Sequence, residues 1–235
     1  MSDKYKIDSH KLMFHTKRVS DWLNGDDIYP IYLEVGVCGK CNHRCIFCAF
    51  DYLNYKGAII EKDVLLGFLS EAAKLGVKSV MYAGEGEPLM HPNIGGIINE
   101  TRKIGIDVAV TTNGVAFSEK LAGRCIKDLS WIKFSLDAAS AGTYSEIHRC
   151  KEKDFYLVVR NIERAVVKKL SNNSVCRIGV QMLLIPENQS EMYDAVELAR
   201  SIGADYFVVK PFTEHPMSEA RLSGKFDYGS PLLLE

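Results

Sequence analysis

Short apolar runs alternate with amphipathic stretches along most of this chain, and the alternation predicts its architecture. Apolar runs of about four to eight residues predict buried strands, whereas apolar positions that recur every three or four residues predict helices packed on one face. The predicted strands cover 31–37, 79–83, 107–111, 131–136, 176–184 and 206–210. The predicted helices that follow the first strand cover 62–75, 94–104, 118–126, 154–170 and 190–202.

Strands that alternate with helices indicate βαβ units and therefore an α/β fold with a parallel sheet. Six such strands, joined by right-handed crossovers, can curl into a partial TIM-like barrel that stops short of the eight strands of a closed one. In barrels of this kind the functional site lies at the carboxyl ends of the strands. Polar residues at those strand ends are therefore the first candidates for chemistry.

The two ends of the chain differ from this regular middle. Asp8 or Ser9 can cap a helix over 10–24, whose apolar stripe predicts a packing element without chemistry. After Phe212 the chain has Gly and Pro but no long amphipathic run, so it is either a minimal or truncated barrel or ends in an irregularly packed tail. The expected division is a helical extension, a barrel and an irregular tail, over 1–30, 31–212 and 213–235.

Composition and charge narrow the class of protein. A chain of 235 residues, 47% hydrophobic and 25% charged, has enough apolar material for one sizeable core. Its 29 basic and 30 acidic residues nearly cancel, so no overall field attracts nucleic acid. No run approaches the roughly 20 apolar residues that span a bilayer, and no signal peptide is evident. Seven cysteines, an odd number, favour metal binding in a reducing cytoplasm over a disulfide framework.

Three of these cysteines form a compact motif directly after the first predicted strand. Cys41, Cys45 and Cys48 have the spacing C-x3-C-x2-C, on what should be a strand-to-helix loop. Thiolates select iron-sulfur clusters, zinc or Cu(I) over hard cations. A cubane cluster usually takes four cysteines, so three would leave one iron open, and an open position is typical of a catalytic site.

Cys38 offers a competing interpretation, because it extends the motif to C-x2-C-x3-C-x2-C. Four thiolates could close a zinc site or a fully ligated electron-transfer cluster. The protein would then be a metal-binding module without catalysis. The spacing of the cysteines alone leaves both interpretations open.

The triad of Cys41, Cys45 and Cys48, with Phe47 just before the third cysteine, resembles the signature of the radical S-adenosylmethionine (AdoMet) superfamily. Over residues 31–212 the resemblance implies a (β/α)6 partial barrel. The three cysteines would hold a [4Fe-4S] cluster, and AdoMet would chelate the fourth iron. Phe47 would help to shield the site from water, and Cys38 would be a bystander.

The resemblance also implies an activity. The reduced cluster would cleave AdoMet to methionine and a 5′-deoxyadenosyl radical, which abstracts hydrogen from a substrate. That substrate is not legible, and a peptide, a sugar and a nucleoside all fit. The electron would come from a partner such as flavodoxin or ferredoxin. A barrel that binds cluster and AdoMet only as a scaffold is a further alternative.

A Gly-rich turn after the second strand is the second anchor of the resemblance. Gly86, Glu87 and Pro88 are similar to the family's Gly-Gly-Glu-Pro motif, with Glu85 where a second glycine often stands. Glycine lets a ligand approach the backbone closely. The resemblance implies that this turn holds the amino group of AdoMet.

Later strand ends supply further candidate AdoMet contacts. Asn113 follows the third strand, Ser135 and Asp137 close the fourth, and the resemblance implies that they meet polar groups of AdoMet. Arg149 could form a bidentate pair with its carboxylate. Ordinary turn chemistry and a solvated surface arginine are the alternatives. Lys210, at the end of the sixth strand, could contact substrate or AdoMet, or remain solvated.

Overall fold

A single sheet of six parallel strands forms the centre of the protein. The computed structural model describes residues 10–219, 222 and 224. The strand order follows the sequence and all neighbouring strands are parallel. The strands are β1 (Tyr32–Val35), β2 (Ser79–Tyr82), β3 (Asp107–Thr112), β4 (Leu129–Ser135), β5 (Arg177–Leu184) and β6 (Tyr206–Pro211).

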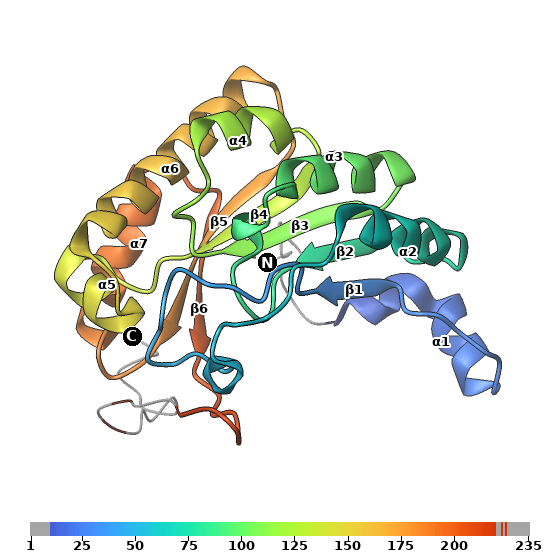
Figure 1. Ribbon diagram of the computed structural model, residues 1–235, viewed down its shortest axis with the longest axis horizontal. Coiled ribbons are helices and arrows are strands. Elements are labelled where there is room, and N and C mark those ends of the chain that lie inside the picture. The colour runs from blue at the N-terminus through green and yellow to red at the C-terminus, as the bar shows by residue number, and fades with distance from the viewer. Residues whose placement is uncertain (1–9, 220–221, 223, 225–235) are drawn as a thin grey trace.

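The helices that connect these strands lie along the outer side of the curved, open sheet (Figure 1). They are α2 (Lys62–Lys74), α3 (Ile94–Ile104), α4 (Glu119–Cys125), α5 (Ala141–His148), α6 (Glu152–Ser171) and α7 (Met192–Ser201). Short 3-10 helices occupy Asp51–Leu53, Pro88–Met90 and Gln189–Glu191. The expected α/β partial barrel with six strands is therefore confirmed.

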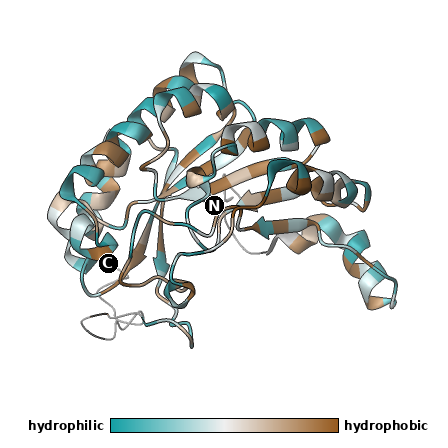
Figure 2. Ribbon diagram, viewed as in Figure 1, coloured by the Kyte–Doolittle hydropathy of each residue, from teal (hydrophilic) through white to brown (hydrophobic). Residues whose placement is uncertain are grey.

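Alternation of buried and partly buried residues, clearest on β2 and β4, separates a packed face from a concave face. On β4, Ile132 and Phe134 are fully buried under the helices, and the Phe134 ring lies 5.6 Å from that of Phe117. Lys133, which lies between them, is only partly buried. Hydrophobic residues accordingly dominate the strands, whereas hydrophilic residues cover the outer helix surfaces (Figure 2). The concave face is left for polar chemistry.

The N-terminal helix corrects one expectation. The predicted continuous helix is a 3-10 helix, His10–His15, followed by α1 (Thr16–Leu23), and the proposed caps at residues 8 and 9 lie outside the described residues. It is not the expected packing element, since α1 buries none of its residues and the side chains of Trp22 and Leu23 are 63% and 72% exposed. The reason is its place beyond β1, the edge strand, where no neighbouring strand extends the core (Figure 1).

The segment after β6 packs against the cysteine loop and forms no helix within the described residues. The Ser218 hydroxyl donates to the Cys48 carbonyl at 2.8 Å. The His215 ring stacks on the Tyr52 ring, with centroids 5.5 Å apart. In the part of the chain that the structure describes, helices with the length and apolar character needed to cross a membrane are absent.

Candidate cofactor site

Backbone hydrogen bonds hold the cysteine loop, which carries Cys41, Cys45 and Cys48, at its base and at its far side. Residues 37–39 pair antiparallel with 58–60, through the bonds Gly39 N–H to Ala58 O and Ile60 N–H to Val37 O. A side chain on Gly39 would overlap the backbone of Gly57, so this crossing requires glycine. At the far side the loop bonds to the end of α5, which lies against it in Figure 1. The loop is thereby stretched across the carboxyl ends of the strands.

The thiols of Cys41, Cys45 and Cys48 converge inside this loop. Burial raises the pKa of Cys41 to about 11, and the neighbouring Glu87 and Cys48 add to the effect. Burial also raises the pKa of Cys45 well above its ordinary value, and Cys41 and Cys48 contribute again. Cys41 and Cys45 are therefore close enough to Cys48 for its charge to raise their pKa values, and Cys41 also raises that of Cys45. Metal ligation, which requires thiolates, would displace protons from these groups.

The three thiols do not form a tight set of donors around a single point. Zinc holds each thiolate at about 2.3 Å, so thiolates bound to one zinc ion lie within about 4.6 Å of one another. Among the described residues, no group of three potential ligand atoms within 4.8 Å of one another contains two of these thiols. The buried Cys38 thiol is 3.8 Å from the carbonyl of Lys40 and belongs to no such group. Three neighbouring thiol donors are the ligand type of an iron-sulfur cluster.

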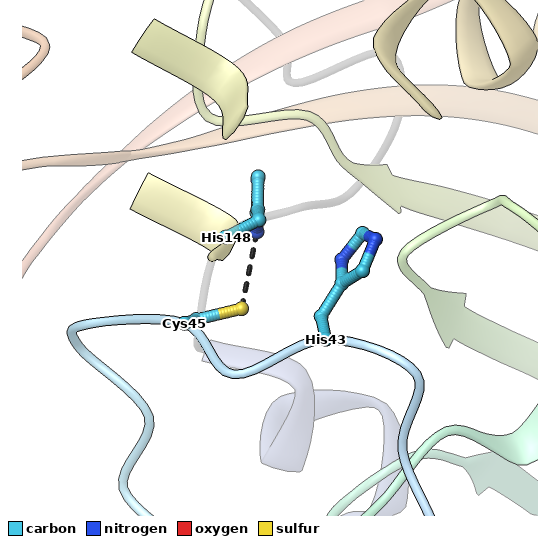
Figure 3. A group of neighbouring side chains, drawn as sticks. All are labelled: His43, Cys45 and His148. Carbon is cyan, nitrogen blue, oxygen red and sulfur yellow. Dashed lines mark hydrogen bonds between the residues drawn. The ribbon is translucent and has the colours of Figure 1, made fainter. Parts of the chain in front are cut away.

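His148 contacts Cys45 directly, with 3.0 Å between its Nδ1 and the sulfur (Figure 3). Its Nε2 lies 3.1 Å from the Leu136 carbonyl, which can only accept, so Nε2 carries the proton. Nδ1 is then the acceptor and the Cys45 thiol the donor. Burial lowers the pKa of His148 to about 3, so the ring is neutral. The sulfur of Cys45 is thereby oriented by a side chain from α5.

His43 lies beside this pair, and neither of its ring nitrogens has a hydrogen-bond partner among the described residues. Its ring is 5.1 Å from that of His148, and burial lowers its pKa to about 4. One ligand atom each from His43, Cys45 and His148 lies within 4.8 Å of the other two. The His43 ring is therefore neutral, and it fills space inside the cysteine loop beside Cys45 and His148.

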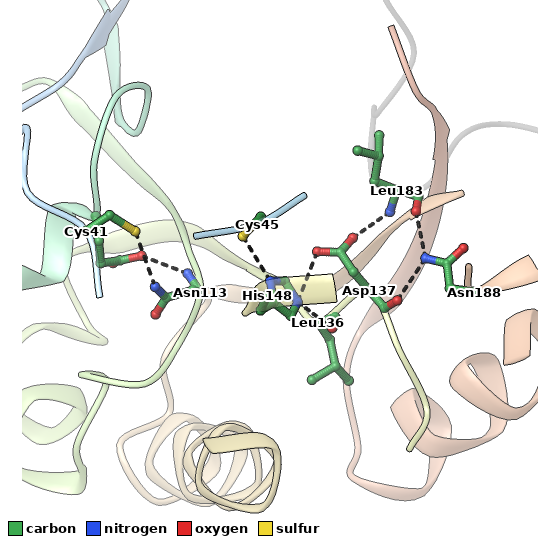
Figure 4. A network of polar contacts seen from close by, with 9 residues as sticks. Cys41, Cys45, Asn113, Leu136, Asp137, His148, Leu183 and Asn188 are labelled. Atoms are coloured by element: carbon green, nitrogen blue, oxygen red, sulfur yellow. Dashed lines mark hydrogen bonds and ion pairs between the residues drawn. The ribbon is translucent and has the colours of Figure 1, made fainter. Parts of the chain in front are cut away.

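Asp137 is buried behind His148 rather than presented at an open surface (Figure 4). One carboxylate oxygen accepts from the Leu183 amide at 2.6 Å, and the other lies 3.7 Å from His148 Nε2 without a hydrogen bond. Asn188 donates to the Asp137 carbonyl at 2.8 Å. Asp137 therefore contributes to the site through its position beside His148, not as a group exposed to a ligand.

Asp137→Asn should stabilise the protein relative to the parent chain more at high pH than at low pH. Burial raises the pKa of Asp137 from 3.8 to about 7, against the opposing effects of the Leu183 amide and Lys133. The stabilisation from the bound proton is complete below about pH 4 and lost as pH rises through 7. Between about pH 5.5 and pH 8 the variant should gain about 2 kcal/mol in unfolding free energy over the parent.

Denaturant unfolding of both proteins at each pH measures this difference. Asp27→Asn, on an exposed loop, is the control and should show no comparable gain. An Asp137→Asn difference that is constant with pH would contradict a neutralised buried carboxyl.

Glu87 joins the Gly-rich turn to β3 and to the cysteine loop. Its buried carboxylate accepts from the amides of Leu89 and Asn113, at 2.9 and 2.8 Å, and from the Thr112 hydroxyl. Its own amide donates to the Lys40 carbonyl at 2.7 Å. Burial raises the pKa of Glu87 and these hydrogen bonds oppose the rise. The Glu87 carboxylate is thus committed to hydrogen bonds inside the protein.

The other predicted residues are distributed unevenly around the loop. Asn113 is buried and its amide donates to Asn42 at 2.8 Å, with Cys41 sulfur at 4.0 Å. The Phe47 ring is 6.0 Å from that of His148. Ser135 is partly buried at the end of β4, and Arg149 is exposed at the end of α5 in a left-handed conformation. The structure thus brings Asn113 and Phe47 to the thiols, and places Arg149 on the surface.

Sequence reasoning missed the residues that α5 contributes. His148 was passed over, and so was Tyr144, a fully buried tyrosine whose hydroxyl has no hydrogen-bond partner. Tyr55, in the segment that follows the three cysteines, was missed as well, although its hydroxyl interacts with Cys48. The sequence does contain a signal for α5. Ser140 is a typical capping residue, and the apolar residues that follow it recur every three or four positions; in the structure Ser140 caps the helix.

Comparisons with known proteins agree with this arrangement. A sequence profile of the Radical SAM superfamily matches residues 35–199. A GTP 3′,8-cyclase from Clostridium perfringens is 29% identical over 173 residues, 72% of this chain and 51% of the relative. A Pyrococcus furiosus protein named as modifying the cofactor of tungsten-containing aldehyde ferredoxin oxidoreductase is 23% identical over 83% of this chain and 56% of its own. The chain thus spans about half the length of these relatives.

Solved structures resemble the fold as well. Streptococcus suis SuiB, in a crystal structure bound to S-adenosylmethionine, superposes with a TM-score of 0.70 at 16% identity. The match covers 92% of this chain and 48% of SuiB. At that identity the likeness concerns the fold.

Proposed function

Because this chain belongs to the Radical SAM superfamily, we propose that it is an enzyme that binds AdoMet beside a [4Fe-4S] cluster and uses it to abstract hydrogen from an organic substrate. The observation that carries the proposal is the convergence of Cys41, Cys45 and Cys48 while the Cys38 thiol contacts Lys40 instead. Three ligands leave a coordination position for a cofactor, which a closed four-cysteine module lacks.

The three thiolates would hold the cluster. When bound and reduced, the cluster would supply the electron that splits AdoMet into methionine and a 5′-deoxyadenosyl radical. Flavodoxin or ferredoxin is the kind of partner that would deliver this electron. The protein itself contributes position and exclusion of water.

The chain's own residues have distinct parts in this proposal. Gly86 and Pro88 shape a turn whose backbone would receive the AdoMet amino group, while the Glu87 carboxylate holds that turn against β3. Asn113 and Ser135 would meet other polar groups of AdoMet. Asp137 acts indirectly, because its carboxylate is buried beside His148. Arg149, exposed at the end of α5, would have to turn inward to reach the AdoMet carboxylate.

The substrate belongs to the same proposal. Relatives are named as GTP 3′,8-cyclases, which supports a nucleotide, and SuiB has been crystallised with a precursor peptide. Because the chain spans about half of such relatives, we propose only hydrogen abstraction from a nucleoside, sugar or peptide. The residues that determine which of these substrates binds would include those of the barrel interior described below.

Anaerobic reconstitution with iron and sulfide, followed by reduction with dithionite, tests the proposal. The expected products are 5′-deoxyadenosine and methionine in equal amounts, measured by liquid chromatography, and an electron paramagnetic resonance spectrum that changes when AdoMet is added. A protein that takes up only zinc, or a cluster spectrum unaffected by AdoMet, would overturn it. A spectrum that changes without any 5′-deoxyadenosine would favour the scaffold alternative.

A further inference from the structure

The concave face of the sheet carries a pair of lysines that the cofactor site does not use. Lys133 lies on β4, whose neighbouring residues Ile132 and Phe134 face the helices, so its side chain faces the opposite way. Lys210 lies near the end of β6. The strand register places Lys133 and Lys210 on the same face, because Lys133 pairs with Gly179 of β5 and Lys210 pairs with Leu183 of the same strand. Lys210 is close enough to lower the pKa of Lys133, so the two side chains approach each other across the concave face although β5 separates their strands.

The charge of this pair is not neutralised by the protein. Neither lysine forms an ion pair with a carboxylate within 4.0 Å among the described residues. Burial and then the positive charge of Lys210 lower the pKa of Lys133 to about 8, while Glu34 and Asp137 oppose the shift at longer range. With a pKa of about 8, the Lys133 amine remains largely protonated at neutral pH. The Lys133 amine is partly removed from water and lies near a second cationic group, an arrangement that an anion bound between the two side chains would stabilise.

The surroundings of Lys133 favour a ligand. Its Nζ lies 5.7 Å from the centre of the Trp131 ring. Trp131 also lines a cavity of about 490 Å³ near the amino ends of the strands, together with Tyr32 and Ala109. Lys210 is exposed and lies near the carboxyl end of its strand. The pair thus stands between an aromatic cavity and the edge that carries the cysteine loop, where a substrate would approach the cofactor.

We propose that Lys133 and Lys210 together bind the negatively charged group of the substrate, a carboxylate or a phosphate, and so set its position below the cofactor. This inference rests on the proposed function, because it assigns the pair to the substrate of the same site. Lysine binds such anions as a point charge, so both carboxylate and phosphate fit the chemistry.

Anion titration of the reconstituted full chain tests the inference without requiring turnover. Trp22→Phe, at an exposed position, leaves Trp131 as the single tryptophan beside the site. Inorganic phosphate and acetate, added at constant ionic strength, should give a saturable change in fluorescence and a calorimetric binding signal for at least one anion. The anion that binds more tightly identifies the charged group.

Variants make the test specific. Lys133→Met and Lys210→Met should each weaken the binding at least about tenfold, which corresponds to a loss of about 1.4 kcal/mol. Lys120→Met, on the exposed surface of α4, should not weaken it. Thermal unfolding checks that each variant folds, and the conservative Lys133→Arg should retain binding.

Adding AdoMet distinguishes whether the lysine pair binds the anionic group of the substrate or the carboxylate of AdoMet. Binding of the probe that persists in saturating AdoMet supports a substrate site, whereas competition by AdoMet would overturn the inference by giving the pair to the AdoMet carboxylate. Absence of binding, or equal binding by the lysine variants, would also overturn it. Formation of 5′-deoxyadenosine by the same samples shows independently whether the proposed function stands.

Discussion

Replacing any one of Cys41, Cys45 or Cys48 with alanine should reduce the iron of the reconstituted protein from about four atoms per chain to nearly none. Each thiol converges with the other two, so none can be spared by a site that has only three. Formation of 5′-deoxyadenosine should fall below detection in all three variants. Iron analysis, the visible absorption of the cluster and product chromatography measure these losses.

Cys38→Ala is the matched control, since it removes a thiol from the same loop. This buried sulfur contacts the Lys40 carbonyl, and its loss should cost only about 1 kcal/mol of folding stability. Iron content and AdoMet cleavage should therefore remain at parent levels. Loss of iron from Cys38→Ala, with the fold retained, would instead support the closed four-cysteine site.

The sequence predicts the sheet well because each strand is a short apolar run with one face under helices. All six predicted strands are present and α3 has the predicted bounds, Ile94–Ile104. The N-terminal helix shows the limit of this reasoning. An apolar stripe predicts burial, but residues 16–23 lie beyond an edge strand, where the structure gives that stripe nothing to pack against.

Some features of the candidate site can be predicted from local sequence patterns, whereas others depend on contacts between residues far apart in the sequence. The cysteine spacing and the turn at Gly86 are local patterns, and they were legible. The contact between Cys45 and His148 joins residues 103 positions apart, and no periodicity encodes it. Asp137 illustrates a further difficulty, because a strand-end aspartate suggests an open polar group, yet its carboxylate accepts a hydrogen bond from the amide of Leu183 on the neighbouring strand β5. Such pairings depend on register and helix placement, which composition and spacing do not specify.

Gly86→Ala should destabilise the protein and weaken AdoMet binding together. Gly86 has a φ of 75°, and a Cβ there would overlap the carbonyl oxygen of Cys38. The left-handed conformation alone costs a residue with a side chain on the order of 1–3 kcal/mol. Relief of the overlap would also push the turn away from the cysteine loop, with which Glu87 now shares a 2.7 Å hydrogen bond. The melting temperature should fall by about 4–8 °C, and AdoMet affinity by at least about tenfold.

Gly67→Ala provides the control for the same chemical change. Gly67 is an exposed residue within α2, and a Cβ there meets no atom within 4 Å. Alanine should therefore stabilise the helix by about 0.5–1 kcal/mol and leave AdoMet binding unchanged. Thermal unfolding and equilibrium binding of AdoMet to the reconstituted proteins measure both effects. If Gly86→Ala melts lower but binds AdoMet with parent affinity, the turn serves the fold alone, and its backbone is not the receptor for the amino group.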